Sequence, residues 1–389
     1  MSTLKVDAIR HNSATSDAIT TAADGTCTAK ITGMTGGGGL SHRNVIINGA
    51  AQVNQRGNQT SVTSTTYSVD RFRFAVSAGG TWSLSQSTDS PDGFSNSVKL
   101  DCTTAAANPG LAIIQQRIEG HNVQAFAKGT SSAKQFAVSF YVKTNKSGVY
   151  TVELKDDDNS RTVSKTFTVS DANWNRYTLI FPADTTGAFD NDSNGSLYLS
   201  IWLAVTANSA YTNGTFSDGT WAALVNGNRV SNSNVNLADS TSNEFLLTGV
   251  QVEVGDTVTS FEHRSIGDEL ARCQRYFYQY VDASLYGSGI APLCVVIGYQ
   301  NNNAFGTTEF PVTMRSTPSL VHVEGTGFFK ILRNAGTGDL NALALHNIGR
   351  NSAAINAYNA SSGTSIAQDQ VGLMQTNDTS CRLGFNAEL

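Results

Sequence analysis

Between Val45 and about Arg264, apolar and polar residues alternate with a period of two. Because successive side chains of a strand point to opposite faces of a sheet, this pattern predicts strands with one buried and one solvated face. The predicted strands are residues 71–74, 81–84, 98–100, 136–140, 150–154, 167–169, 177–181, 197–203 and 245–254. Turn clusters rich in Asp, Asn and Gly separate them, so we expect an antiparallel, jelly-roll-like β-sandwich over residues 45–264.

The composition also favours an all-β protein. Charged residues make up 15% of the 389 residues, against roughly 25% in typical soluble domains. Gly, Ser, Thr and Asn fill the difference, and they suit strands and tight turns better than long helices. The 26 basic and 31 acidic residues give a net charge of −5 with no basic block, so we expect no nucleic-acid partner.

The segments on either side of the sandwich have different patterns. Residues 1–44 predict an extended arm and a glycine linker, because apolar residues are few and Gly36–Gly39 is a run of four glycines. Residues 265–280 predict a short linking helix and a strand, with Ser265 as N-cap and Asp268 three residues later. Residues 281–389 predict a second, smaller β-rich domain.

We expect six strands in and before this second domain. They are residues 276–281, 294–299, 310–314, 320–323, 328–332 and 381–385. Pro311 and Pro318 indicate that the strands beside them begin there or lie at a sheet edge, because proline cannot donate a backbone hydrogen bond.

Sequence signals for export or membrane insertion are missing. No apolar run reaches 18 residues, and the N-terminus lacks an apolar signal segment, so we expect neither a membrane span nor secretion through a signal peptide. The five cysteines are odd in number and far apart, which favours reduced thiols and synthesis in a cytoplasm.

The sequence predicts no catalytic residues and no cofactor. The six histidines are scattered, and neither a G-x-S-x-G elbow nor an H-E-x-x-H zinc motif occurs. No C-x-x-C pair suggests a zinc site. Paired carboxylates for glycoside hydrolysis stay open, because they need only meet in the fold. The acidic run Asp156-Asp157-Asp158 is better explained as a solvated hairpin tip.

One acidic segment is a weak calcium candidate. Asp190, Asp192 and Asn194, followed by Gly195, match the first half of an EF-hand loop, in which alternate oxygens bind the cation. Ile201 stands where the bidentate Glu should be. An Asx-rich turn between two strands is therefore the preferred interpretation.

The long polar segment from Val205 to Asn236 is the main binding candidate. It carries Tyr211, Phe216 and Trp221, five residues apart, among many Asn, Ser and Thr residues. Flat aromatic rings can bind the apolar faces of sugars while amides bind the hydroxyls, so these three residues are candidate glycan contacts. The alternative is that the rings pin the loop to its own sandwich or to a neighbouring subunit.

Several motifs resemble virion proteins of tailed bacteriophages, particularly tail fibres of marine and cyanobacterial phages that contain a carbohydrate-binding-module-like sandwich. The motifs are Asn48–Gly57 (NGAAQVNQRG), Tyr67–Phe72 (YSVDRF), Phe245–Gly255 (FLLTGVQVEVG), Phe261–Ser265 (FEHRS) and Gln274–Phe277 (QRYF). The two ends, Ser2–Asp7 (STLKVD) and Gly384–Leu389 (GFNAEL), are similar to the ends of such proteins.

The resemblance implies a homotrimeric tail fibre that attaches the virion to bacterial surface polysaccharide. It also implies that the N-terminal arm docks on other virion tail proteins, and that the chain is made in the host cytoplasm and located in the tail. Three copies would multiply weak glycan contacts through avidity. A capsid-decorating or head-fibre protein, a polysaccharide depolymerase and a cellular carbohydrate-binding module remain alternatives.

Overall fold

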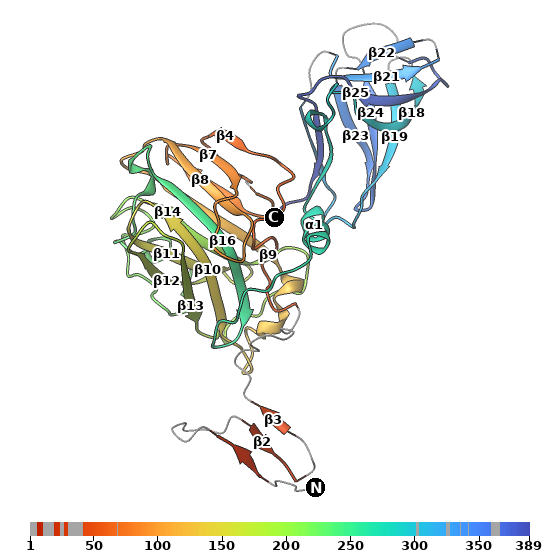
Figure 1. The fold of residues 1–389 in the computed structure, drawn as a ribbon. Coiled ribbons are helices and arrows are strands. Elements are labelled where there is room, and N and C mark those ends of the chain that lie inside the picture. The colour runs from red at the N-terminus through yellow and green to blue at the C-terminus, as the bar shows by residue number, and fades with distance from the viewer. Residues whose placement is uncertain are drawn as a thin grey trace.

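The computed structural model describes residues 6–10, 19–23, 27–29, 42–67, 69–300, 303–323, 327–334, 336–340, 342–358 and 366–389. These residues form an all-β protein with a two-sheet sandwich and a second β domain, as Figure 1 shows. The predicted fold class is thus confirmed. In the predicted arm, β1 (Ala8–Ile9), β2 (Ile19–Thr21) and β3 (Cys27–Ala29) form a small antiparallel sheet. The four-glycine run lies outside the described residues.

The sandwich consists of two antiparallel sheets. One has the order β13 (Asn175–Phe181), β10 (Phe136–Thr144), β16 (Glu244–Val254), β8 (Ser97–Thr104), β7 (Thr81–Ser87), β4 (Gln59–Val62). The other has the order β15 (Ala222–Ala223), β12 (Arg161–Val169), β11 (Gly148–Asp156), β14 (Gly195–Ala204), β9 (Leu111–Glu119), β6 (Arg73–Ser77), β5 (Thr66–Tyr67).

The inner faces of the two sheets form one large hydrophobic core. Trp82, Phe140, Tyr150 and Phe245 are fully buried in it, with many aliphatic residues from the alternating positions. The core therefore explains the period-two pattern, because every second side chain of these strands points into it. The alternate side chains of the seven-stranded sandwich sheet point away from this core, to its outer face.

The predicted linking helix is present as α1 (Ile266–Gln274), and the side chain of Ser265 accepts a hydrogen bond from the Asp268 amide at 3.2 Å. This is the predicted cap. In the described part of the chain α1 is the one α-helix, and at nine residues it is far shorter than the roughly 20 that a membrane span needs.

The second domain has two sheets. A three-stranded sheet has the order β17 (Phe277–Asp282), β26 (Arg382–Asn386), β20 (Ser319–Val323). A seven-stranded sheet has the order β22 (Gly336–Leu340), β21 (Phe329–Arg333), β25 (Val371–Thr376), β18 (Pro292–Gln300), β19 (Asn303–Glu309), β24 (Ser352–Tyr358), β23 (Ala342–Ile348). Buried residues including Phe329, Ile331 and Ile355 form its separate core.

Two local predictions were wrong. Residues 310–314 do not form a strand, and the amides of Phe310 and Met314 each donate at 2.8 Å to carbonyls of Asn351 and Arg350. Both side chains are buried, so their apolar character reflects packing of an irregular segment. Asp156 ends the β11–β12 hairpin as expected but is not solvated, because it is buried against Lys128 at 2.5 Å.

The sandwich and the second domain are joined by a buried polar junction, which we define as Arg56, Asp70, Arg71, Tyr276 and Glu388. Arg71 is 1% exposed, pairs with Glu388, and lies 3.4 Å from the centre of the Tyr276 ring. Arg56 bridges Asp70 at 3.0 Å and Glu388 at 3.3 Å. The C-terminal residues are thereby fixed against the sandwich, as Figure 1 shows.

Candidate functional site

The structure does not bring the three predicted aromatic rings together on one open surface. Trp221 is 9% exposed, its ring packs 5.8 Å from that of Phe136, and its indole donates to the Pro182 carbonyl at 2.8 Å. Tyr211 is half-buried beside Trp202, and Phe216 is half-buried. Trp221 therefore pins the loop to the sandwich core, which was the alternative interpretation.

The calcium candidate has the geometry of a turn. The Asp192 carboxylate accepts from the backbone amide of Asn194 at 2.8 Å and also from its side chain, while Asp190 is exposed. Among the described residues, no group of three or more His, Cys, Asp or Glu could hold a metal ion. The segment leads into β14 as an Asx turn.

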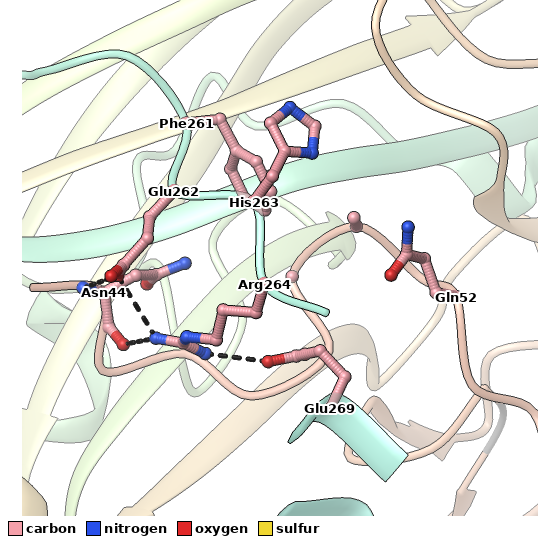
Figure 2. Close-up of a pocket in the computed structure, with 9 residues that line it drawn as sticks. Asn44, Gln52, Phe261, Glu262, His263, Arg264 and Glu269 are labelled. Atoms are coloured by element: carbon pink, nitrogen blue, oxygen red, sulfur yellow. Dashed lines mark hydrogen bonds and ion pairs between the residues drawn. The ribbon is translucent and has the colours of Figure 1, made fainter. Parts of the chain in front are cut away.

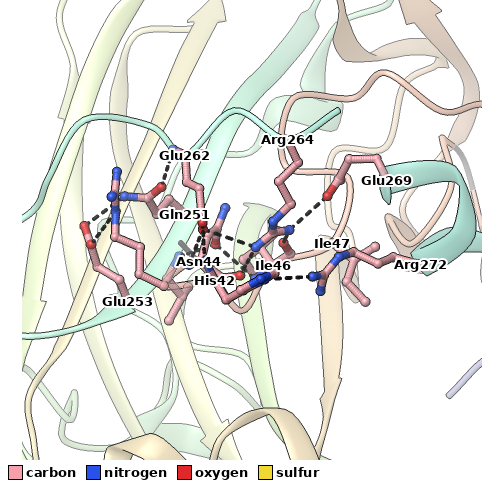
Figure 3. A network of polar contacts seen from close by, with 12 residues as sticks. His42, Asn44, Ile46, Ile47, Gln251, Glu253, Glu262, Arg264, Glu269 and Arg272 are labelled. Atoms are coloured by element: carbon pink, nitrogen blue, oxygen red, sulfur yellow. Dashed lines mark hydrogen bonds and ion pairs between the residues drawn. The ribbon is translucent and has the colours of Figure 1, made fainter. Parts of the chain in front are cut away.

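A small pocket lies where the chain enters the sandwich (Figure 2). Arg264 donates to Glu269 at 2.9 Å, and the Asn44 amide donates to Glu262 at 2.8 Å. Figure 3 shows that the network continues to Arg272, which contacts the His42 ring at 3.1 Å. Because protein groups already bind both carboxylates, this network fixes residues 42–47 to α1 and to β16, and we assign it a structural role.

A larger cavity of about 490 Å³ lies between the sandwich and the second domain. Arg56, Tyr67, Phe277 and Arg382 are among the residues that line it. Arg56 stacks 3.7 Å from the Phe277 ring centre and is paired with the junction carboxylates, and Arg382 pairs with Asp282 at 3.1 Å. These two cations of the wall are thus already neutralised.

The outer face of the seven-stranded sandwich sheet carries a row of polar side chains. The strand register places Tyr67, Arg73, Gln115, Ser200 and Glu153 opposite one another across β5, β6, β9, β14 and β11. The Gln115 side chain accepts from Arg73 at 3.1 Å and donates to the Ser200 hydroxyl at 2.9 Å. The row is therefore held in place by its own hydrogen bonds.

A second row lies beside the first, with Arg117, Tyr198 and Lys155 in register on β9, β14 and β11. The Arg117 guanidinium lies 4.6 Å and the Lys155 ammonium 5.2 Å from the centre of the Tyr198 ring. The Tyr198 hydroxyl donates to Asp157 at 2.7 Å. Burial and this hydrogen bond raise the pKa of Tyr198, so the phenol stays neutral.

The loop from Val205 to Asn236 covers the far side of this face. Arg229 forms two hydrogen bonds with the buried Glu153 carboxylate, at 2.7 and 3.0 Å, and lies 5.1 Å from the Trp202 ring centre. Tyr211 and Val230 cover Trp202. The half-buried cations that stay accessible on this face are Arg73, Arg117 and Lys155. Lys155 is paired with Asp157, and Tyr67 lies opposite Arg73.

Four residues of this face, Arg73, Gln115, Arg117 and Tyr198, were missed from the sequence. One signal was present, because Arg73 occupies a polar position in a strand whose alternate positions are core. Chemically, the face offers guanidinium, amide and hydroxyl groups beside aromatic rings, and such groups can bind a hydroxyl-rich or anionic ligand.

No protein-family model and no curated protein sequence matches the chain. Solved structures do match. The C-terminal family 22 carbohydrate-binding module of Clostridium thermocellum Xyn10B matches with 13% identity over 57% of this chain and 99% of that one, at a TM-score of 0.30. The family 11 carbohydrate-binding module of the same organism, in complex with a mixed-linked tetrasaccharide, matches with 11% identity over 53% and 98%, at 0.26.

Proposed function

We propose that this chain is a non-enzymatic glycan-binding protein that binds polysaccharide with the outer face of its seven-stranded sandwich sheet. The observation that carries this proposal is the double row of polar and aromatic residues around Arg73, Gln115, Arg117 and Tyr198. Interior strand positions rarely hold such a group unless it has a structural or binding role, because each member must be satisfied. An extended face rather than a deep pocket suits a polymer chain.

We further propose that the chain is a homotrimeric tail fibre of a bacteriophage that attaches the virion to host surface polysaccharide, with the N-terminal arm docked on other tail proteins. The motifs described above support this assignment. A capsid-decorating or head fibre is the second candidate, and it uses the same binding face.

An exposed apolar face on the second domain supports self-association. Val295, Ile297 and Tyr299 of β18 are 65%, 49% and 65% exposed, and Val371 of β25 and Leu332 of β21 are 60% and 47% exposed. Ile297 and Val371 are directly opposite in the sheet, so the residues are contiguous. Soluble monomers rarely expose such patches, which favours burial between copies of the chain.

Three measurements test the proposal. Light scattering of the purified chain should give the mass of a trimer, and antibody against the chain should label the tails of phage particles in electron microscopy. A monomeric mass contradicts the trimer, and label on the capsid selects the head-fibre candidate. Binding of the chain to host polysaccharide without release of reducing sugar is expected, whereas release would identify a depolymerase.

A further inference from the structure

Two arginines on the proposed binding face share one neutral acceptor. Arg73 Nη1 and Arg117 Nε both donate to Gln115 Oε1, at 3.1 and 3.0 Å. Gln115 is 7% exposed, and its amide is held by Ser200, so its oxygen has a fixed position between the two guanidinium groups.

Neither Arg73 nor Arg117 takes part in an ion pair within the described parts of the chain. Several other arginines are neutralised: Arg71 lies against Glu388, Arg229 against Glu153 and Arg275 against Glu119. Arg272, Arg315 and Arg333 are also half-buried without an ion pair in the described residues, but each bonds to its own acceptors, whereas Arg73 and Arg117 share one.

Two positive charges this close together repel each other, and an amide oxygen cannot neutralise them. Burial and the charge of Arg117 both lower the pKa of Arg73. A guanidinium has five N–H donors, and the hydrogen bonds to Gln115 use one on each arginine. Both side chains are half-buried, so further donors face solvent.

We infer that Arg73 and Arg117 together bind the carboxylate of an acidic sugar residue, so that the polysaccharide recognised by this face contains uronic acids. This inference rests on the proposed glycan-binding function and names its ligand class. A planar carboxylate fits two guanidinium groups and relieves their repulsion. The half-buried ring of Tyr67, directly opposite Arg73, provides apolar surface for the sugar beside it.

The experiment compares the full chain with two double variants of equal charge. Arg73→Gln with Arg117→Gln removes the pair, and Lys134→Gln with Lys143→Gln removes two charges from the region of the other sheet. Each protein is titrated by calorimetry with polygalacturonate and alginate, with the same polymers after carboxyl reduction to neutral sugars, and with single-stranded DNA. Circular dichroism confirms that both variants are folded.

We expect the full chain to bind an acidic polymer, to bind its reduced form and DNA at least about tenfold more weakly, and to lose affinity in added salt. The arginine variant should lose about 100-fold, at about tenfold for each charge-assisted contact, and the lysine control should bind normally. Equal binding of acidic and reduced polymers, equal binding of DNA, or unchanged binding by the arginine variant overturns the inference while glycan binding stands. Failure to bind any polymer, acidic or neutral, counts against both proposals.

Discussion

Removal of the Glu388 carboxylate is the sharpest perturbation of the junction between the two domains. Glu388 is paired with Arg71 and lies 3.3 Å from Arg56, and the side chains are 4%, 1% and 11% exposed in that order. In Glu388→Ala, Arg71 keeps its hydrogen bond to the Arg117 carbonyl and its contact with the Tyr276 ring but has no counter-charge.

Breaking a buried ion pair from one side costs about 3–5 kcal/mol, because the remaining charge is left buried and unpaired. The loss should fall within this range, since Arg71 has no access to solvent. Urea unfolding measures this loss of stability. All variants are compared at one protein concentration, because self-association also adds stability. Fluorescence reports the sandwich alone, because Trp82, Trp174, Trp202 and Trp221 all lie there, and circular dichroism reports both domains.

A double variant separates the charge effect from loss of packing. Arg71→Met combined with Glu388→Met removes both charges and retains side-chain volume. The double variant should lose less stability than the sum of the losses in Arg71→Met and Glu388→Met, by about 1–3 kcal/mol. Additive costs, or a Glu388→Ala variant with the stability of the original chain, would refute the view that this pair holds the domains together.

Three further predictions use other parts of the molecule. Burial raises the pKa of Glu119, but hydrogen bonds from Arg275 and Tyr276 outweigh it and lower the pKa overall. The stabilising contribution of Glu119 should therefore be present above about pH 4.5 and lost as the pH falls through the lowered pKa. In Glu119→Gln the free energy of unfolding should depend less on pH in this acidic range. Gly49→Ala should destabilise by about 1–3 kcal/mol or more in urea, because a Cβ would lie 2.2 Å from the Val250 carbonyl oxygen; an unchanged midpoint would contradict this. Val295→Asp should reduce the mass measured by light scattering without loss of circular dichroism, because a charge would enter the proposed contact between copies.

The strands of the sandwich could be predicted because most have one buried and one polar face. β9 was missed for a physical reason: it reads LAIIQQRIE, and the outward Ile113 is covered by Trp202 and Val230 while Gln116 points inward and is bonded to Ile47. Both faces of this strand are covered, so the period-two signal is lost.

The proposed binding face could not be predicted because it depends on strand order. Arg73 and Arg117 lie far apart in the sequence and meet only because β6 pairs with β9. Alternation assigns side chains to faces but does not say which strands are neighbours. The aromatic residues of the loop gave the clearer signal in the sequence. In the structure, however, Trp221 packs in the sandwich core.

Four of the seven motifs on which the phage resemblance rests contribute residues to the junction: Asn48–Gly57, Tyr67–Phe72, Gln274–Phe277 and Gly384–Leu389. Arg56, Asp70 and Arg71 come from the start of the sandwich, Tyr276 follows α1, and Glu388 ends the second domain. Burial raises the pKa of Asp70 to about 6 despite its ion pair with Arg56, so these charges are costly to bury. Arg71 is paired with Glu388 only when both domains are docked. Each domain alone would leave part of the cluster unpaired. We therefore expect the two domains to stabilise each other through this junction, which links the sandwich to the second domain.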